Sequence, residues 1–221
     1  MKQGNYPSQT EEQLKLDLKT RKTAHEFRSN SVLKGDDDMK LASHELNDLA
    51  ELTMGCYNTI GCMASFIQQA QDPELKQMLT RQFPLHVADY NLKVEFLQSQ
   101  STPDIDKFQP DQQVRTLSDF TSNVGTPQPG QPRTEVQTHT DREIATSYLL
   151  NQKSSAKNYA VASVECANPD LRHFLEKAFL NSNRHAYEVW QYMVQKGYYP
   201  LLPASEESLS SLSSFFQPVQ Q

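Results

Sequence analysis

The sequence predicts an all-α protein, a four-helix bundle built from two helical hairpins. Apolar residues recur at three- and four-residue steps over residues 39–70, 73–100 and 140–199, which is the spacing of a stripe that faces a core. Two tight reversals of the same construction, Asp72-Pro73-Glu74-Leu75 and Asn168-Pro169-Asp170-Leu171, divide these stretches. Each reversal therefore predicts a pair of antiparallel helices.

The two hairpins also match each other at a constant offset of 96 residues. This offset superposes one reversal on the other and aligns a further set of identical residues: Ala64 with Ala160, Pro73 with Pro169, Leu79 with Leu175, and Phe83 with Phe179. Leucine at four-residue steps is common in helices, but a shared cap and proline are harder to obtain by chance. We interpret the hairpins as an internal repeat.

The first hairpin is expected at residues 37–100, after a polar, charge-mixed segment. Residues 1–36 have little apolar periodicity, and we expect them to form a mobile tail. Asp36, Asp37 and Asp38 offer caps for a helix that begins near residue 39. That helix would run about thirty residues, roughly 45 Å, a length typical of bundles.

Residues 101–139 predict a crossover linker between the hairpins. Five prolines and two glycines in this stretch leave room for one short helical segment, near residues 112–120. About twelve extended residues would span a ~40 Å bundle. The linker is therefore long enough for a bundle with one long crossover.

The second hairpin, residues 140–199, carries the clearest boundary signals. Thr140 followed by Glu143 is typical of a capping box. Lys196, Gly197 and Pro200 mark the end of the last helix. Trp190 lies on the apolar stripe of that helix, and its size makes it the expected centre of contact between the hairpins.

The C-terminal segment, residues 200–221, is rich in serine, and we expect it to be a disordered tail. Phe215 and Phe216 stand out in it as a docking peptide for a partner. Tyr198 and Tyr199, directly after the last helix, are a second candidate contact. The alternative for these tyrosines is that they fold back and cover the end of the bundle.

Composition excludes several function classes. The formal net charge of −6 argues against a nucleic-acid partner held through its phosphates. The chain has no run of 18 apolar residues, and its N-terminus lacks the apolar region of a secretory signal, so we expect neither a membrane span nor secretion. Three cysteines without CxxC spacing suggest neither a disulfide framework nor a zinc site.

The second hairpin resembles the coat F family of bacterial spore-coat proteins. The resemblance rests on Asp141-Arg142-Glu143, Asn168-Pro169-Asp170-Leu171-Arg172, His185 and Lys196-Gly197-Tyr198-Tyr199. It implies a ferritin-like helical fold and a structural role in the spore, and it brings no catalytic residue. The first hairpin departs from the pattern, because it has Gln100 and Ser101 where the second has its Gly-Tyr-Tyr ending.

A ferritin-like bundle raises the question of a di-metal site, which uses Glu-x-x-His motifs on facing helices. No Glu-x-x-His occurs in this chain. The remaining metal candidates are Glu165, His185 and Glu188, of which His185 and Glu188 lie three residues apart on one helix face. A solvated or internally hydrogen-bonded side chain is the commoner fate of such residues, so we expect no metal and no other cofactor.

No enzyme motif replaces the missing metal motif. The chain has no GxGxxG, Walker, GxSxG or HExxH pattern, and its seven glycines offer little material for phosphate-binding loops. We therefore expect a non-enzymatic structural or interaction protein of the bacterial spore, made during sporulation, that contacts other spore proteins. The alternatives are a ferritin-like metal-binding or oxidoreductive protein, and a helical adaptor that recruits partners through its tails.

Overall fold

The computed structural model describes residues 41–98, 103–112 and 124–219, and within these ranges every regular element is helical. The first hairpin consists of α2 (Ser43–Gln69) and α3 (Pro73–Gln98), and the second of α4 (Asp141–Glu165) and α5 (Pro169–Gln195). A short 3-10 helix, η1 (Ile105–Lys107), lies in the linker, and α6 (Glu206–Phe215) follows the bundle. The predicted mobile segment 1–36 lies outside the described residues.

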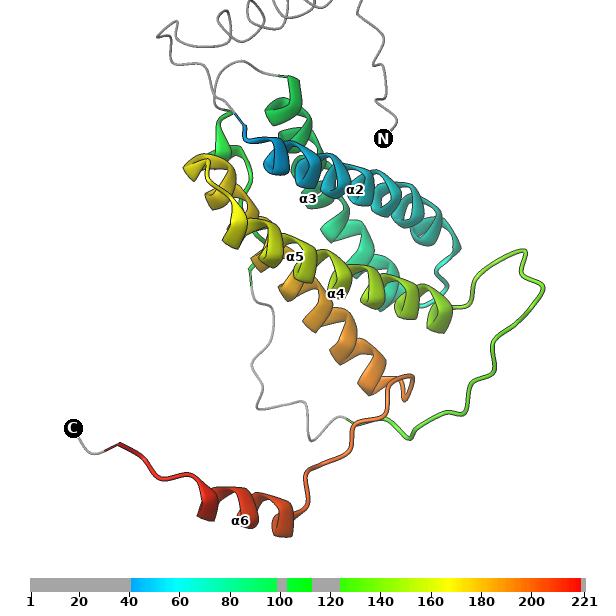
Figure 1. The fold of residues 1–221 in the computed structure, drawn as a ribbon. Helices are drawn as coiled ribbons and strands as arrows, with labels where there is room; N and C mark the ends of the chain where they lie inside the picture. Colours follow the sequence, from blue (N-terminus) through cyan, green and yellow to red (C-terminus); the bar gives the residue numbers. More distant parts are fainter. Residues whose placement is uncertain (1–40, 99–102, 113–123, 220–221) are drawn as a thin grey trace, which may run out of the picture. The chain divides into compact units, whose positions relative to one another are not determined.

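The four long helices form the predicted four-helix bundle (Figure 1). α2 packs along α3 and α4 along α5, and the hairpins then meet through α2 against α4 and α3 against α5. Each helix therefore has two neighbours, and α3 and α4 are joined by the long crossover. The all-α class and the two-hairpin architecture are confirmed.

The boundaries of the second hairpin agree with its capping signals. The Thr140 side chain accepts a hydrogen bond from Glu143 N–H, and Glu143 accepts one from Thr140 N–H. Asn168 Oδ1 accepts from the N–H groups of Asp170 and Leu171. These bonds satisfy backbone donors that the first turn of a helix leaves unpaired.

The first hairpin begins later than expected. α2 starts at Ser43, and Asp36 to Asp38 lie outside the described residues. Ala42 takes the N-cap position, and its N–H donates to Glu45 Oε2 at 2.6 Å. A glutamate inside the first turn therefore does what the upstream aspartates were expected to do.

Two carboxylates at the helix starts connect the hairpins reciprocally. Glu45, at the start of α2, accepts hydrogen bonds at Oε1 from the N–H groups of Ala167 and Asn168, at the reversal of the other hairpin. Asp141, at the start of α4, accepts from the N–H groups of Gln71 and Asp72, at the reversal of the first. Glu45 and Asp141 are 96 residues apart, as are the groups they bind. Equivalent positions of the internal repeat thus make equivalent contacts.

The bundle interior has two apolar clusters separated by polar residues. One cluster surrounds Met63, Leu79, Tyr148 and Val189, and the other surrounds Leu49, Phe96, Tyr159 and Phe174. On each helix, buried polar residues lie between the two clusters: Thr59, Gln82, His86, Asp89, Gln152 and His185. We call this set the polar layer.

The linker contributes to the core, which its composition did not predict. Phe108 is 1% exposed and packs edge-on against Phe174. A 3-10 helix that was not expected, η1, lies earlier in the linker, while the segment predicted near residues 112–120 falls, beyond residue 112, outside the described residues. A proline-rich composition indicates breaks in helix periodicity but does not show which apolar residue will find a place in a core.

Two further expectations are corrected. Trp190 is only partly buried and stacks on Tyr187 at the edge of one apolar cluster, so it is not the centre of contact between the hairpins. The 200–221 tail is not disordered throughout, because α6 occupies part of it. Ser205 caps α6, Glu206 and Glu207 lie in its first turn, and none of its residues is buried. The serine-rich, low-complexity sequence of this segment obscured these local helix signals.

Candidate functional site

The polar layer and the adjoining Lys93 occupy the place where a bundle of this shape would hold a metal. Lys93 and Asp89 lie one helical turn apart on α3, with Lys93 Nζ 2.5 Å from Asp89 Oδ1. Lys93 Nζ also donates to Tyr159 OH at 2.8 Å, and Tyr159 OH donates to Asp89 Oδ2 at 2.7 Å. Cys56 Sγ donates to the same Asp89 oxygen. A lysine ammonium therefore supplies the positive charge at this point of the interior.

Burial and pairing act in opposite directions on this ion pair. Burial alone would raise the pKa of Asp89 and lower that of Lys93, but their mutual attraction reverses both shifts, so the pKa of Asp89 lies below and that of Lys93 above its ordinary value. Burial, together with the Asp89 charge, raises the pKa of the Cys56 thiol to about 12. Cys56 is thus a protonated thiol and not a nucleophile at neutral pH.

A second hydrogen-bonded chain joins α3, α4, α5 and the linker. Tyr148 OH donates to Gln82 Oε1 at 2.6 Å, and His86 Nε2 lies 3.0 Å from the Tyr148 oxygen and 3.2 Å from His185 Nδ1. Because the tyrosine hydrogen goes to Gln82, the Tyr148 oxygen accepts the single hydrogen of His86 Nε2. His185 Nε2 then carries its hydrogen toward Asp111 Oδ2 at 3.3 Å.

This arrangement keeps both histidines neutral. Burial lowers the pKa of His86 to about 3, and the neighbouring His185 adds to the shift. Burial also lowers the pKa of His185, although Asp111 acts in the opposite direction. The hydrogen bond from His185, with further contribution from Arg81, holds the pKa of Asp111 near 2.

The three metal candidates do not converge. His185 is fully buried, and its ring nitrogens face His86 and Asp111. Glu188 accepts hydrogen bonds from Arg81 and Gln82. Glu165 is exposed at the end of α4, roughly 24 Å along the hairpin from His185 at ~1.5 Å per residue. Within the described part of the chain, no group of three or more His, Cys, Asp or Glu side chains could hold a metal ion.

A surface groove is the other candidate site. It has a volume of about 1370 Å³ and lies along α2 and α4, closed on one side by the end of the linker and by the residues after α5. We call it the α2/α4 groove and define it by Tyr57, Gly61, Phe66, Val136, Leu150 and Tyr199. Tyr57 is 73% and Leu150 61% exposed. An apolar groove rimmed by polar residues is a candidate interaction site.

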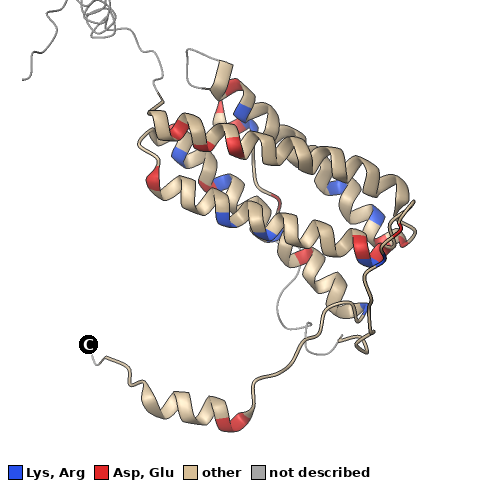
Figure 2. Cartoon of the chain, turned by 45° about the vertical axis from the view of Figure 1, so that its right-hand side comes forward, with Lys and Arg blue, Asp and Glu red and all other residues tan. Residues whose placement is uncertain are grey.

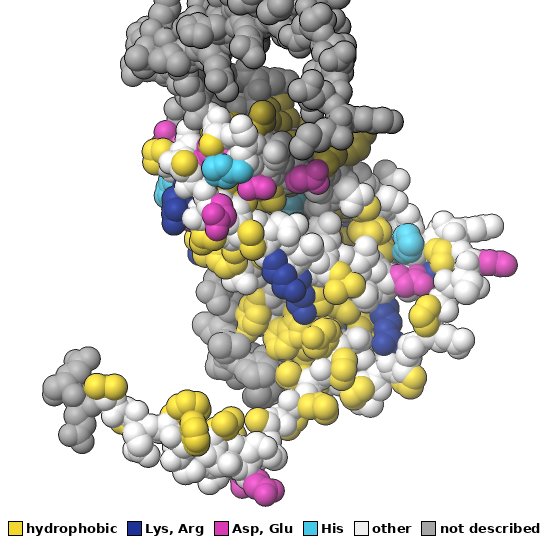
Figure 3. All heavy atoms as spheres, viewed as in Figure 1, with side chains coloured by type: hydrophobic (Ala, Val, Ile, Leu, Met, Phe, Trp, Pro, Cys, Tyr) yellow, Lys and Arg dark blue, Asp and Glu magenta, His cyan; other side chains and the backbone are white. Residues whose placement is uncertain are grey.

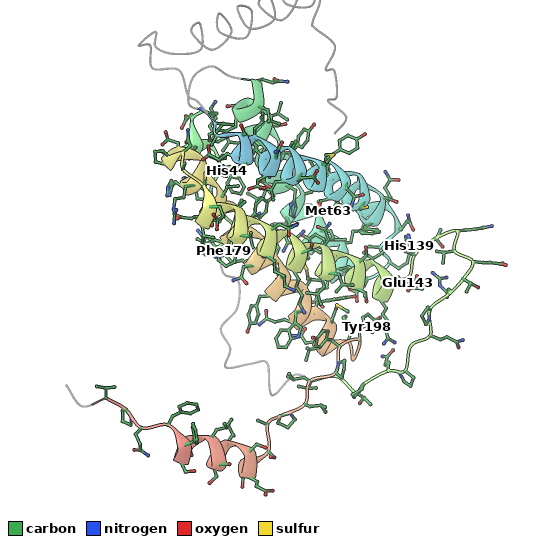
Figure 4. All side chains as sticks on the ribbon, viewed as in Figure 1. His44, Met63, His139, Glu143, Phe179 and Tyr198 are labelled. Carbon is green, nitrogen blue, oxygen red and sulfur yellow. The ribbon has the colours of Figure 1, made fainter. Side chains whose placement is uncertain are left out.

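One end of the α2/α4 groove is built by residues from three parts of the chain. His139, Glu143 and Tyr198 all line it, and Figure 4 shows them at the same end of the bundle. The His139 ring meets Phe66 of α2 edge-on. Gly197, with φ of +70°, turns the chain after α5. Its backbone lies so close to Thr126 that an added Cβ would be 2.0 Å from the Thr126 backbone oxygen. The close approach fixes Tyr198 and Tyr199 at the groove.

Two cations border the groove along α4. The Arg142 guanidinium lies over the Tyr198 ring at 5.7 Å, and Lys153 Nζ lies over the Tyr199 ring at 5.2 Å. They are separated along the helix by roughly 16 Å at ~1.5 Å per residue, so they flank the groove and do not share one end. Figure 3 shows cationic side chains among hydrophobic ones on one face of the molecule. Neither Arg142 nor Lys153 has a carboxylate within ion-pair distance in the described ranges.

The residues predicted to contact a partner differ in their burial. Tyr198 and Tyr199 pack against the bundle end, as the alternative interpretation had it, and yet remain part of the groove wall. Phe215 and Phe216 are 77% and 69% exposed on α6 and its C-cap. Sequence reasoning missed Lys93 and Asp111, since a lysine four residues after an aspartate ordinarily indicates a solvated helix face.

No helix among the described residues is long and apolar enough to cross a membrane. Charged side chains are spread along the bundle helices and at the first turn of α6 (Figure 2).

Comparisons with known proteins agree with the resemblance seen in the second hairpin. The model of the coat F domain family matches residues 140–202. The spore coat protein F-like protein YhcQ of Bacillus subtilis strain 168 is 26% identical over 196 residues, which covers 86% of this chain and 87% of the relative. A crystal structure of a candidate spore coat protein from Bacillus halodurans C-125 is similar in fold, with a TM-score of 0.55 and 15% identity over 76% of this chain and 97% of that one. The second hairpin, within residues 140–202, thus matches the coat F domain, and the chain over most of its length is similar to a spore coat protein F-like protein.

Proposed function

We propose that this chain is a non-enzymatic structural protein of the bacterial spore coat, made during sporulation, which works through its outer surface. The observation that carries the proposal is the contrast between a bundle interior whose buried charges, Lys93 and Asp89, are paired and an outer face that leaves an apolar groove and an apolar helix exposed. The match of residues 140–202 to the coat F domain and the likeness of the chain to YhcQ support the spore-coat role.

The interior supports a structural role because its charges are already paired. Lys93 compensates the Asp89 carboxylate, and Arg81 lies between Asp111 and Glu188. A redox di-metal site would need several of these carboxylates free to bind cations. The cysteine thiols in the interior are held protonated, with the pKa of Cys166 raised to about 12 by burial and by the nearby Glu45.

The experiment follows the protein into spores. A tagged chain is expressed during sporulation in a spore-forming bacterium, spores are purified, and the coat fraction is extracted and probed. We expect the wild-type chain in the coat fraction. The purified protein is also assayed for metal content.

Two results would contradict the proposal. Absence of the wild-type chain from purified spores would remove the coat role. Retention of about two metal ions per purified chain would favour the oxidoreductive alternative, since a di-metal site binds two ions. A variant with Asp89→Asn and Lys93→Met serves as a control in the metal assay. It removes both charges of the buried ion pair, where a metal ion would compete with the Lys93 ammonium for Asp89.

A further inference from the structure

Two apolar surfaces have no partner among the residues that the structure describes. One is the α2/α4 groove. The other is the stripe of α6 formed by Leu209, Leu212, Phe215 and Phe216, which are 58%, 60%, 77% and 69% exposed. These residues recur at steps of three or four and lie on one side of the helix. The remaining helix positions are serine and glutamate.

α6 needs a surface to remain helical. It has ten residues, and isolated helices shorter than about 12–15 residues are marginal in water even when rich in alanine. Half of its residues are serine, which is a weaker helix former than alanine. The Ser205 cap and the two glutamates in the first turn contribute only about 0.3–1 kcal/mol each. The helix is therefore expected to be stable when its apolar stripe is covered.

The α2/α4 groove has the size and chemistry to cover this stripe. A ten-residue helix is about 15 Å long and ~10 Å wide, which corresponds to on the order of 1200 Å³. The groove has about 1370 Å³ and is lined along its length by Tyr57, Phe66, Leu150 and other apolar side chains. Recognition of an amphipathic helix by a groove buries such a stripe at spacings of three and four residues.

Charge favours the acidic helix as the occupant of the groove. Glu206 and Glu207 place two carboxylates at the N-terminal end of α6. Arg142 and Lys153 border the groove along α4, without a carboxylate in ion-pair distance in the described part of the chain. Opposite charges on the helix and on the border of the groove are complementary and disfavour a basic occupant.

The connection between the groove and α6 disfavours docking within one chain. Tyr199 belongs to the groove wall, and only residues 200–205 separate it from Glu206. Pro200 and Pro203 fix φ and hold the residues before them in extended conformations, so that six residues extend roughly 19 Å at ~3.1 Å per residue. To enter its own groove, α6 would have to reverse over this stiffened connection.

We therefore propose that α6 of one chain docks in the α2/α4 groove of a second copy. Each copy then offers one helix and accepts one, which makes the contact heterologous and able to propagate from chain to chain. This inference deepens the proposed function and rests on it: it names a second copy of this chain as the partner through which a coat protein would assemble.

The test uses two complementary variants of the full chain. Leu150→Glu alters the groove, because it replaces an apolar side chain by a charge that repels Glu206 and Glu207. Leu212→Ser with Phe215→Ser alters only the helix stripe. All three side chains are at least 60% exposed, so the bundle should melt as the wild type does. Val161→Glu is the matched control, since Val161 is 66% exposed on the same helix and does not line the groove.

Analytical ultracentrifugation measures assembly over a concentration series. We expect the wild type to self-associate and the Val161→Glu control to do so within about twofold of it. Leu150→Glu and the helix variant should each weaken association at least ~10-fold, the loss that ~1.4 kcal/mol produces. An equimolar mixture of these two variants should form a one-to-one complex, because the mixture restores one intact helix and one intact groove.

Three results would overturn the inference: a monomeric wild type over the whole series, equal effects of Leu150→Glu and Val161→Glu, or no complex in the mixture. A monomeric wild type would include the case in which α6 enters its own groove. Such a failure stays separate from the proposed function, because a chain that does not self-associate but is found in the coat fraction of spores contradicts this inference alone.

Discussion

Lys93 is fully buried at the centre of the bundle, where its ammonium contacts Asp89 and Tyr159. Both charges have lost their hydration, and this loss is offset only while the pair and its hydrogen bonds are complete. The ion pair is thus a condition for the interior packing and a weak source of net stability. Removal of only one member of the pair is expected to lower the stability strongly, because the other charge stays buried.

Lys93→Met should destabilise the protein by about 3–5 kcal/mol, because it leaves the Asp89 carboxylate buried without a cation. Asp89→Leu should cost a similar amount by stranding the ammonium. The double variant should recover most of the loss, since no buried charge then remains. Urea denaturation of all four proteins measures the cycle, and additive losses in the double variant would contradict the paired interpretation.

The two buried histidines predict a loss of stability in acid. The pKa of His86 is lowered to about 3 and that of His185 is also lowered, so the folded state favours the neutral rings. Their contribution is complete above the unfolded value of about 6.5 and is lost as the pH falls from there toward the folded value. Asp111, Glu188, Arg81, Asp89, Lys93 and Tyr148 are the titratable or charged groups facing the pair.

We expect the free energy of unfolding to fall by up to about 1.4 kcal/mol per pH unit for each histidine below pH ~6.5. His86→Gln should reduce this slope by about half, because glutamine can hydrogen-bond Tyr148 and does not titrate. Chemical denaturation at pH 7, 6 and 5 tests the prediction. Asp111, with its pKa near 2, titrates below this window. An unchanged slope in the variant would assign the acid sensitivity to other groups.

At the scale of elements, the reversals of the bundle are capped from the opposite hairpin. Glu45 is 3% exposed and accepts backbone N–H groups from Ala42, Ala167 and Asn168. Burial alone would raise its pKa, but these hydrogen bonds, that of Asn168 foremost, hold it below its usual range. Asp141 makes the equivalent contacts in a more exposed position.

Glu45→Ala should therefore cost more stability than Asp141→Ala. Removal of Glu45 leaves several buried donors unsatisfied, at about 1–3 kcal/mol each, whereas water can replace Asp141 at the other reversal. Thermal unfolding of the two variants gives the comparison. Equal losses would indicate that the reversals do not differ in solvent access.

The crossover linker is part of the core through Phe108. Phe108→Ala should cost about 3–5 kcal/mol, the range for a large aromatic side chain in a closed core. Trp190→Ala is the control and should cost less, because Trp190 is partly exposed and its neighbours can be hydrated. Denaturant midpoints measure both, and a larger loss at Trp190 would restore it as the centre of the bundle.

At the scale of the whole molecule, both apolar clusters draw residues from both hairpins. Leu49 and Phe96 of the first hairpin meet Tyr159 and Phe174 of the second in one cluster, and the other cluster is mixed in the same way. The coat F domain at residues 140–202 therefore buries much of its apolar surface against the first hairpin. We therefore do not expect the segment that matches the family to fold by itself.

Residues 140–202 produced alone should consequently lack a cooperative unfolding transition. We expect reduced helix content by circular dichroism and binding of an apolar dye, because the faces that contact α2 and α3 would be exposed to water. Residues 41–202 serve as the control and should melt cooperatively. A cooperative transition in the shorter chain would show that the second hairpin folds without the first.

The sequence by itself determined the four helices, both reversals and the internal repeat. Thr140 with Glu143, and Asn168 with Pro169, act on backbone groups within four residues of themselves, so their effects can be derived from local spacing. The repeat offset of 96 residues can likewise be derived from the sequence alone. In the structure, Glu45 and Asp141 are separated by this offset and make equivalent contacts.

Only the tertiary structure decided where the polar groups of the interior lie. Lys93 meets Tyr159 at a separation of 66 residues and Cys56 meets it at 103, and no local pattern records such distances in sequence. A lysine and an aspartate one turn apart look the same on a solvated face and in a core, because helix periodicity gives the face of a residue and not what covers it. The burial of Phe108, the peripheral place of Trp190 and the pairing of His86 with His185 depended on how the two hairpins meet, because burial is a property of the assembled bundle.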